Sequence, residues 1–292
     1  MRSVNNPLIS IVMPVWNAAP YLREAIDSIL NQSFREFELI AVDDGSTDES
    51  VSIIESYEDP RIRLIQQGRK GFVAAVNHGV AEARAEWIAR HDADDISHPQ
   101  RLESQWLLAK KHPNSVLIHC GTDFFGIQVG TQGTARFART QALIALRSSM
   151  MCPVCVGAAL IPKQAFLRAS GYREEDFPAE DFAFASRLLR MGRFVGTPRI
   201  LYRIRTHEGQ ISQVKREAQI KQTNRISLEN CAYFFRTSPE KADTLRSILK
   251  NCPEYNNTRH MLAMLKALTR FRFQSVELWM WAVHRAITAK RS

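Results

Sequence analysis

Short apolar runs alternate with helical patterns over the first hundred residues. The run "LISIVMPVW" (8–16) is rich in Ile and Val, as in a strand that is covered on both faces. Between such runs, apolar residues recur at helical spacing, as Leu22, Ile26 and Ile29 do. Strands that alternate with helices in this way predict an α/β fold with a mainly parallel, doubly wound sheet. Four runs are expected to be the first strands of that sheet: "LISIVMPVW", "FELIAVDDGS", "IRLIQQ" and "WIARHD".

The pattern loosens from about residue 120. The stretch "GTDFFGIQVGTQGTARF" has the Gly and Thr punctuation of a hairpin or a long loop. Further strands and a helix follow it, and the chain is helical and basic beyond Gln213. We therefore expect a main domain over residues 1–212, with halves at 7–120 and 121–212, and a helical C-terminal extension over 213–292.

Composition narrows the class of protein. The chain has 292 residues, 45% of them hydrophobic, which is enough for a large core. A net charge of +9 suits an anionic partner such as a nucleotide, a nucleic acid or an acidic membrane face; a mildly basic soluble protein is the alternative. No apolar run is long enough to span a membrane, and no signal peptide is expected. Five cysteines form no evident disulfide framework, so a cytoplasmic location is expected.

Carboxylates gather where two of the predicted strands end. Asp43 and Asp44 end one strand, and Asp92, Asp94 and Asp95 follow another. Because ligands of such sheets bind beyond the carboxyl ends of the strands, these acids are expected to meet in one crevice. Alternatively, these acids only cap the helices that follow the strands. Capping would explain one acid at each turn, but it does not easily explain clusters at two strand ends.

Four segments together resemble the family-2 glycosyltransferases of the GT-A fold. They occur in the order of that family, and the resemblance covers about residues 7–212. It implies a GT-A domain over 1–212, with a nucleotide-binding half (7–120) and an acceptor half (121–212). The matching segments are "SIVMPVWN" (10–17), "ELIAVDDGSTDES" (38–50), "DADDISHPQRL" (92–102) and "AEDFAFASRLLRMG" (179–192).

The resemblance implies a divalent metal, Mn²⁺ or Mg²⁺, at the Asp92-Ala93-Asp94 motif. Asp94 would be the main ligand, and Asp92 would face the ribose or sugar of the donor or share the metal. Clustered acids repel when empty, and at ~4 Å and an effective dielectric constant near 20 one charge pair is worth roughly 4 kcal/mol before desolvation. Asp95 would support the ligands from behind or cap the next helix. His207 would contact the metal or the diphosphate, or be structural.

The nucleotide pocket is implied at the ends of the first two strands. Trp16 would stack on the base, Pro14 would set the backbone turn and Asn17 would steady the loop. Asp44 would accept the N3–H of uracil or thymine, which favours a UDP- or dTDP-sugar donor. A basic residue is expected near the diphosphate, either Lys70 or its neighbour Arg69.

The resemblance places the catalytic base at Asp181, next to the substrate-binding Glu180. The acceptor hydroxyl becomes a good nucleophile only as its proton is removed. A carboxylate on the face opposite the diphosphate would give single displacement with inversion. Alternatively, both acids only favour a helix N-terminus through the helix dipole.

The resemblance implies synthesis of a surface polysaccharide or lipopolysaccharide, with a saccharide or lipid-linked acceptor; protein and small-molecule acceptors stay open. No nucleic-acid partner is expected. Two rival functions are a non-catalytic nucleotide-sugar-binding protein and a sugar-nucleotide pyrophosphorylase, although the loop "PVWNAAPYL" lacks the glycines of the latter. The aromatic and basic residues of segment 270–291 suit either peripheral contact with the cytoplasmic face of the inner membrane or packing on the domain.

Overall fold

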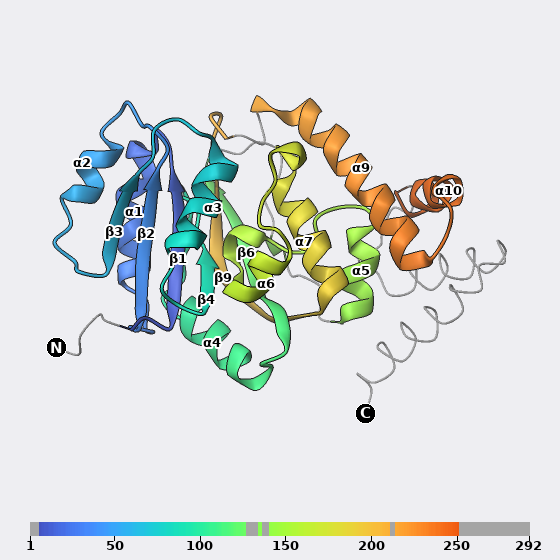
Figure 1. Ribbon diagram of the computed structural model, residues 1–292, viewed down its shortest axis with the longest axis horizontal. Coiled ribbons are helices and arrows are strands. Elements are labelled where there is room, and N and C mark those ends of the chain that lie inside the picture. The colour runs from blue at the N-terminus through green and yellow to red at the C-terminus, as the bar shows by residue number, and fades with distance from the viewer. Residues whose placement is uncertain (1–5, 127–133, 136–139, 211–213, 251–292) are drawn as a thin grey trace.

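A computed structural model describes residues 6–126, 134–135, 140–210 and 214–250. Nine strands of these residues join one sheet in the order β3-β2-β1-β4-β8-β6-β9-β5, and β7 pairs with β6. Figure 1 shows the sheet with helices packed along it, and α9 crossing the side away from the N-terminus. The predicted α/β class is confirmed.

The first four strands are parallel, as predicted. They are β1 (Ile9–Val15), β2 (Phe37–Asp43), β3 (Ile62–Gln66) and β4 (Trp87–Arg90). The helices between them are α1 (Ala19–Leu30), α2 (Ser50–Glu55) and α3 (Phe72–Glu82). Since parallel neighbours need a crossover connection, a helix lies between each of these four strands and the next of the four.

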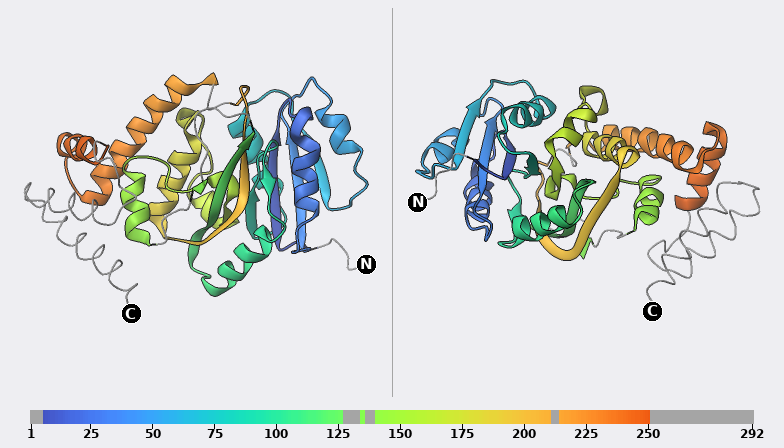
Figure 2. Two further views of the ribbon diagram at one scale, coloured as in Figure 1. Left: turned by 180° about the vertical axis from the view of Figure 1, so that it is seen from behind. Right: turned by 60° about the horizontal axis from the view of Figure 1, so that its bottom comes forward.

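Two apolar cores cover the two faces of the sheet. Alternate residues of β1 point to opposite faces, so Val12 packs with α3 while Ile11 and Met13 pack with α1 and α4 (Arg101–Lys111). Figure 1 has α3 in front of the sheet, and the view from behind in Figure 2 has α1 in front. Truncating a fully buried residue such as Ile26 to Ala is expected to cost about 2–5 kcal/mol.

Beyond β4 the sheet is mixed rather than parallel. β8 (Leu160–Pro162) pairs antiparallel with β4 and with β6 (Ser115–Gly126). β9 (Arg193–Thr206) is parallel to β6 and antiparallel to β5 (Ile96–Ser97). Parallel pairing is therefore found among the first four strands and between β6 and β9, whereas the other pairs are antiparallel, so the sheet is mixed and not mainly parallel. The short β7 (Thr134–Ala135) pairs antiparallel with β6. Of the two alternatives for this stretch, a hairpin or a long loop, this pairing agrees with the hairpin.

Helices of the second half pack against β6, β8 and β9. They are α5 (Gln141–Ser148), α6 (Lys163–Arg168) and α7 (Glu180–Met191), with short 3-10 turns at Val156–Ala158 and Glu174–Asp176. Since β6 runs across position 120, the two expected halves share one sheet.

The region after residue 213 is helical where the structure describes it. α9 (Arg216–Phe235) and α10 (Pro239–Lys250) form this part. The buried Asn230 of α9 donates to the Ser148 carbonyl (3.0 Å) and to Ser186 Oγ (2.7 Å), which ties α9 to α5 and α7. No helix of the described residues is long and apolar enough to cross a membrane. Segment 270–291 lies outside the described residues.

Candidate active site

The expected acids lie at one edge of the sheet, beyond the carboxyl ends of β2 and β4. Asp43 is the last residue of β2, and Asp44 directly follows it. The segment after β4 contains Asp92, Asp94 and Asp95. β1 lies between β2 and β4 in parallel register, so its own end, with Trp16 and Asn17, lies between the two acid groups.

Trp16 and Arg69 form an exposed aromatic–cation contact at this edge. The indole is 49% exposed, and the Arg69 guanidinium carbon lies 3.5 Å from its ring centroid. Trp16 is therefore not a core residue, and its stacking on a base stays a prediction. Of the two basic candidates, Arg69 makes side-chain contacts here, whereas Lys70 contributes its backbone N–H.

The carboxylate of Asp44 is buried and holds the loop that follows β3. Its Oδ1 accepts the backbone N–H of Lys70 (2.7 Å) and that of Gly71 (3.0 Å), and also Gln67 Nε2 (2.9 Å). Its Oδ2 accepts the Gly71 N–H at 2.9 Å and lies 3.5 Å from Arg69 Nη1. A carboxylate accepts about four bonds, so a nucleobase N–H would replace Arg69, the longest contact. Nucleobase recognition by Asp44 stays a prediction.

Asn17 and Pro14 shape the loop at the end of β1. Asn17 Oδ1 accepts the Thr47 N–H at 2.8 Å, and the Asn17 N–H donates to Ser46 Oγ at 3.0 Å. These bonds join the loops that follow β1 and β2. Pro14 is buried within β1, opposite Val42 of β2, one residue before the strand ends. Its implied role in setting the turn of the backbone stays a prediction.

Asp92 pairs with the buried Arg90. Arg90 Nη2 donates to Asp92 Oδ1 at 2.6 Å, and the Asp92 N–H donates to the Tyr202 hydroxyl at 3.0 Å. Gly157 lies against this carboxylate, because a Cβ built there would be 2.5 Å from Asp92 Oδ2. A glycine is needed at that position for the acid to keep its place.

Asp94 and His207, 113 positions apart in the chain, lie together. His207 Nε2 is 2.9 Å from Asp94 Oδ2, and the imidazole packs on Tyr21 with ring centroids 4.7 Å apart. Burial, and secondarily the charge of Asp92, raises the pKa of Asp94. Among the described residues no three His, Cys, Asp or Glu side chains form a ready metal cluster.

This pair nevertheless fits a divalent cation bound with a donor. Two ligands of one small cation, each about 2.1 Å from it and at right angles, lie about 3 Å apart, close to the Asp94–His207 separation. Mg²⁺ and Mn²⁺ sites commonly use one or two protein ligands and fill the other positions with phosphate and water. Asp92, engaged by Arg90, stays a predicted third ligand.

Asp95 anchors the end of β9, the strand that directly precedes His207. It is buried, and its Oδ1 accepts the Arg205 N–H at 2.8 Å. Arg205 Nε donates to the Asp94 carbonyl at 2.8 Å, which is a second bond between β9 and the segment that follows β4. Helix α4 begins only at Arg101, with Gln100 as the residue before it, so the capping alternative for Asp95 is wrong.

Glu180 and Asp181 lie in the first turn of α7. Burial, and then the charge of Asp181, raises the pKa of Glu180 to about 8. The pKa of Asp181 is also raised by burial and, more weakly, by Asp92, while Arg90 lowers it. These interactions place the Arg90–Asp92 pair next to α7, so the carboxylates from positions 92 and 181 belong to one electrostatic cluster.

Sequence reasoning missed several residues that hold this site together. Arg90, two positions before the acid motif, was detectable as a charge inside an apolar strand. Tyr172 and Tyr202 carried no such signal, because each meets its acidic partner only in the folded chain. Tyr172 O–H donates a hydrogen bond to Asp181 Oδ1.

Known proteins share both the sequence and the fold. Part of the chain, residues 10–161, matches the glycosyl transferase family 2. An uncharacterized glycosyltransferase of Haemophilus influenzae is 29% identical over 248 residues, 79% of this chain and 75% of that relative. The S. aureus TarS 1–349 structure in complex with UDP-GlcNAc superposes with a TM-score of 0.59 at 17% identity, over 96% of this chain and 92% of that one.

A second solved structure agrees with the first. The mannosyltransferase PcManGT from Pyrobaculum calidifontis, in complex with GDP-Man and Mn²⁺, has a TM-score of 0.56 at 17% identity, over 98% of this chain and 86% of its own. Likeness at this identity concerns the fold, and it confirms the expected GT-A architecture. Because the family match spans just over half of the residues, the chain belongs to glycosyl transferase family 2.

Proposed function

We propose that the chain is an inverting, metal-dependent glycosyltransferase that uses a UDP- or dTDP-linked sugar. The observation that carries the proposal is the convergence of the Asp94–His207 pair, the Arg90–Asp92 pair and Asp181 at one edge of the sheet. A protein that only binds a nucleotide sugar could use the Asp94–His207 pair, but it would need no general base at position 181.

The donor would lie across the ends of β1, β2 and β4. Its base would stack on Trp16, either in place of the Arg69 guanidinium or together with it, since that cation covers the ring at 3.5 Å. Asp44 holds the loop that bears Arg69 and is a candidate acceptor for an imide N–H. A bound Mn²⁺ or Mg²⁺, held by Asp94 and His207, would neutralise charge on the leaving diphosphate.

Asp181 would supply the general base. Its carboxylate removes the proton of the acceptor hydroxyl as the oxygen bonds to the anomeric carbon of the sugar. The bond from that carbon to the diphosphate oxygen breaks on the opposite face, the nucleoside diphosphate leaves with the electron pair, and the configuration inverts. The proton stays on Asp181 until solvent removes it.

The acceptor in this proposal is a saccharide or a lipid-linked saccharide of a surface polysaccharide or lipopolysaccharide. Segment 270–291 would place the enzyme at the cytoplasmic face of an anionic membrane, where each basic residue adds about 1 kcal/mol. Vesicle co-sedimentation tests this part. Salt-sensitive pelleting that is lost on truncation after Thr269 supports it, and no pelleting of the full chain at low salt contradicts it.

A thermal-shift panel of UDP-, dTDP- and GDP-sugars with Mn²⁺ tests the donor. A donor at about 100 times its dissociation constant stabilises the fold by roughly 2.7 kcal/mol, which should raise the melting temperature by several degrees. The stabilising donor should then release its nucleoside diphosphate slowly to water. Stabilisation without any release, with or without acceptor extracts, would favour a non-catalytic binding protein.

A further inference from the structure

Tyr172 lies in the loop that follows α6 and reaches the proposed base. Its ring is 3% exposed, and its hydroxyl donates to Asp181 Oδ1. No hydrogen bond engages Asp181 Oδ2 among the described residues, and Asp181 as a whole residue is partly rather than fully buried. One oxygen is therefore held by the tyrosine, and the other is left to meet an acceptor.

The loop that carries Tyr172 is fastened from two sides. Asn77 of α3 clamps its backbone, since Asn77 Nδ2 donates to the Tyr172 carbonyl (2.9 Å) and Asn77 Oδ1 accepts the Tyr172 N–H (3.0 Å). Arg187 of α7 donates from Nε to the Ala169 carbonyl (2.9 Å) and from Nη2 to the Gly171 carbonyl (2.7 Å). Helices from both halves of the chain thus fix the position of one tyrosine.

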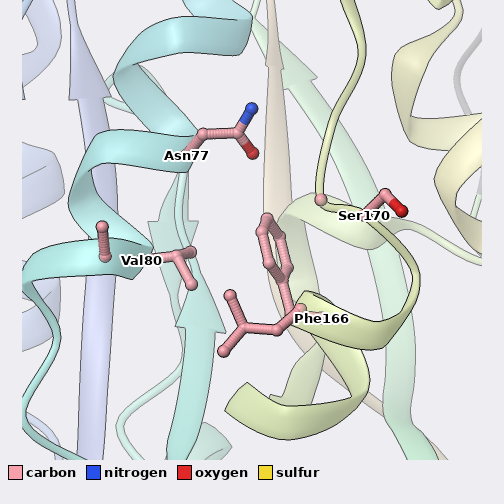
Figure 3. A pocket seen from close by; sticks show the side chains of 7 residues that line it. Asn77, Val80, Phe166 and Ser170 are labelled. Carbon is pink, nitrogen blue, oxygen red and sulfur yellow. The ribbon is translucent and has the colours of Figure 1, made fainter.

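This fastening depends on close backbone approach. Gly171 has φ +55°, and a Cβ at that position would lie 2.6 Å from Asn77 Oδ1. Figure 3 shows Asn77 on α3 facing the loop of Ser170, with Phe166 between them on the wall of a small pocket. A side chain at Gly171 would push the amide away from Tyr172.

The ring of Tyr172 also joins the base to the donor side of the site. It stacks on Phe72 at a centroid distance of 6.2 Å and meets Phe184 edge-on at 5.0 Å. Phe72 begins α3 directly after Gly71, whose N–H binds Asp44. A rigid ring thus connects the loop held by Asp44 with the carboxylate of Asp181.

We propose that Tyr172 is a positioning residue for Asp181, which holds the carboxylate in one orientation and favours its ionised, proton-accepting form. This inference rests on the proposed role of Asp181 as the base. Asn77 acts one step further back, by fixing the backbone from which Tyr172 reaches the carboxylate.

The groups around Asp181 raise and lower its pKa, and the Tyr172 hydroxyl acts against those that raise it. Burial is the largest influence and raises the pKa of Asp181, Asp92 raises it further, and both Arg90 and the Tyr172 hydroxyl lower it. Loss of the hydroxyl therefore leaves the pKa higher. The charged and titratable groups that interact with Asp181 are Arg90, Asp92, Cys152, Cys155, Tyr172 and Glu180.

The test is a pH titration of aspartate carboxyl carbons by ¹³C NMR in the full chain, which needs neither donor nor acceptor. The signal missing from Asp181→Asn identifies Asp181. Tyr172→Phe keeps the ring and removes only the hydroxyl. It should raise the pKa of Asp181 by about one unit, because a hydrogen bond to an ionised group is commonly worth a tenfold change or more.

Tyr57→Phe is the matched control. Tyr57 O–H donates to Asp27 Oδ1 at 2.8 Å on an exposed surface, and loss of this bond should leave the pKa of Asp181 unchanged. An unchanged Asp181 pKa in folded Tyr172→Phe, or an equal change in Tyr57→Phe, overturns the inference.

Asn77→Ala provides a second variant if Tyr172→Phe does not fold. It should also raise the pKa of Asp181, and an unchanged pKa in this variant counts against the inference. The proposed function fails separately. If Asp181→Asn, with Mn²⁺ present, still releases the nucleoside diphosphate at the wild-type rate from the UDP-, dTDP- or GDP-sugar that stabilises and is hydrolysed by the wild type, Asp181 is not the base, whatever the titration shows.

Discussion

Asp181→Asn tests the general base while leaving the other parts of the site unchanged. The substitution keeps the volume of the side chain, and the amide oxygen can still accept the hydrogen bond from Tyr172. What is lost is an oxygen able to take a proton. Loss of a general base typically costs about 10²–10⁴ in rate, which is roughly 2.7–5.4 kcal/mol of transition-state stabilisation.

The same substitution should not weaken the fold. Because burial raises the pKa of Asp181, the folded state favours its protonated form, and ionisation at higher pH costs stability. Asparagine mimics the protonated form at every pH. The melting temperature of Asp181→Asn should therefore equal or exceed that of the wild type at neutral pH, and the difference should vanish as the pH falls below the ordinary range of aspartate.

The assay is release of the nucleoside diphosphate from the stabilising donor with Mn²⁺, together with calorimetric donor binding. The wild-type rate should fall at acidic pH, with a midpoint above the ordinary aspartate range, since the base must be ionised. Asp243→Asn, at an exposed position of α10, is the matched control and should change neither quantity. Turnover of Asp181→Asn within tenfold of the wild type, or lost donor affinity with normal turnover at saturation, would refute the assignment.

Three further variants probe the donor site and the fold. Asp94→Ala removes the carboxylate that lies 2.9 Å from His207, so release should fall at least ~100-fold and the Mn²⁺-dependent thermal shift should vanish; wild-type activity in excess EDTA would contradict the metal role. Trp16→Ala should weaken UDP binding by about 1–3 kcal/mol in calorimetry, with little loss of stability because the indole is 49% exposed; unchanged affinity would exclude stacking. Glu38→Ala removes a buried acid that binds the partly exposed Arg84, so urea unfolding should show a loss of about 3 kcal/mol. Burial raises the pKa of Glu38, but the hydrogen bonds from Arg84, Ser10 and Arg63 together lower it, so the wild type should lose this stability as the pH falls below the usual range of glutamate.

The direction of the strands in the C-terminal part of the sheet could not be predicted from the sequence. Further strands were expected after the loop that begins near residue 120, but not the antiparallel place of β8 between β4 and β6. Apolar periodicity reports which face of a strand is covered, and it is silent on direction when the partners come from far along the chain. The parallel first half was readable because each strand there is joined to the next through a local helix.

The gathering of carboxylates at the edge of the sheet beyond β2 and β4 was largely determined by the sequence itself. Asp43 ends one strand, and Asp44 and the acids at 92–95 follow strands; the ends of these strands must meet at one edge once the strands are parallel. The contacts that give these acids different surroundings were decided by the tertiary structure alone. Arg205 reaches Asp95 across 110 positions, and Tyr172 reaches Asp181 from a loop without a regular pattern. Burial and charge depend on such distant neighbours, so the sequence determined which carboxylates gather, and only the folded chain decided which is paired, which anchors a strand and which keeps an oxygen free.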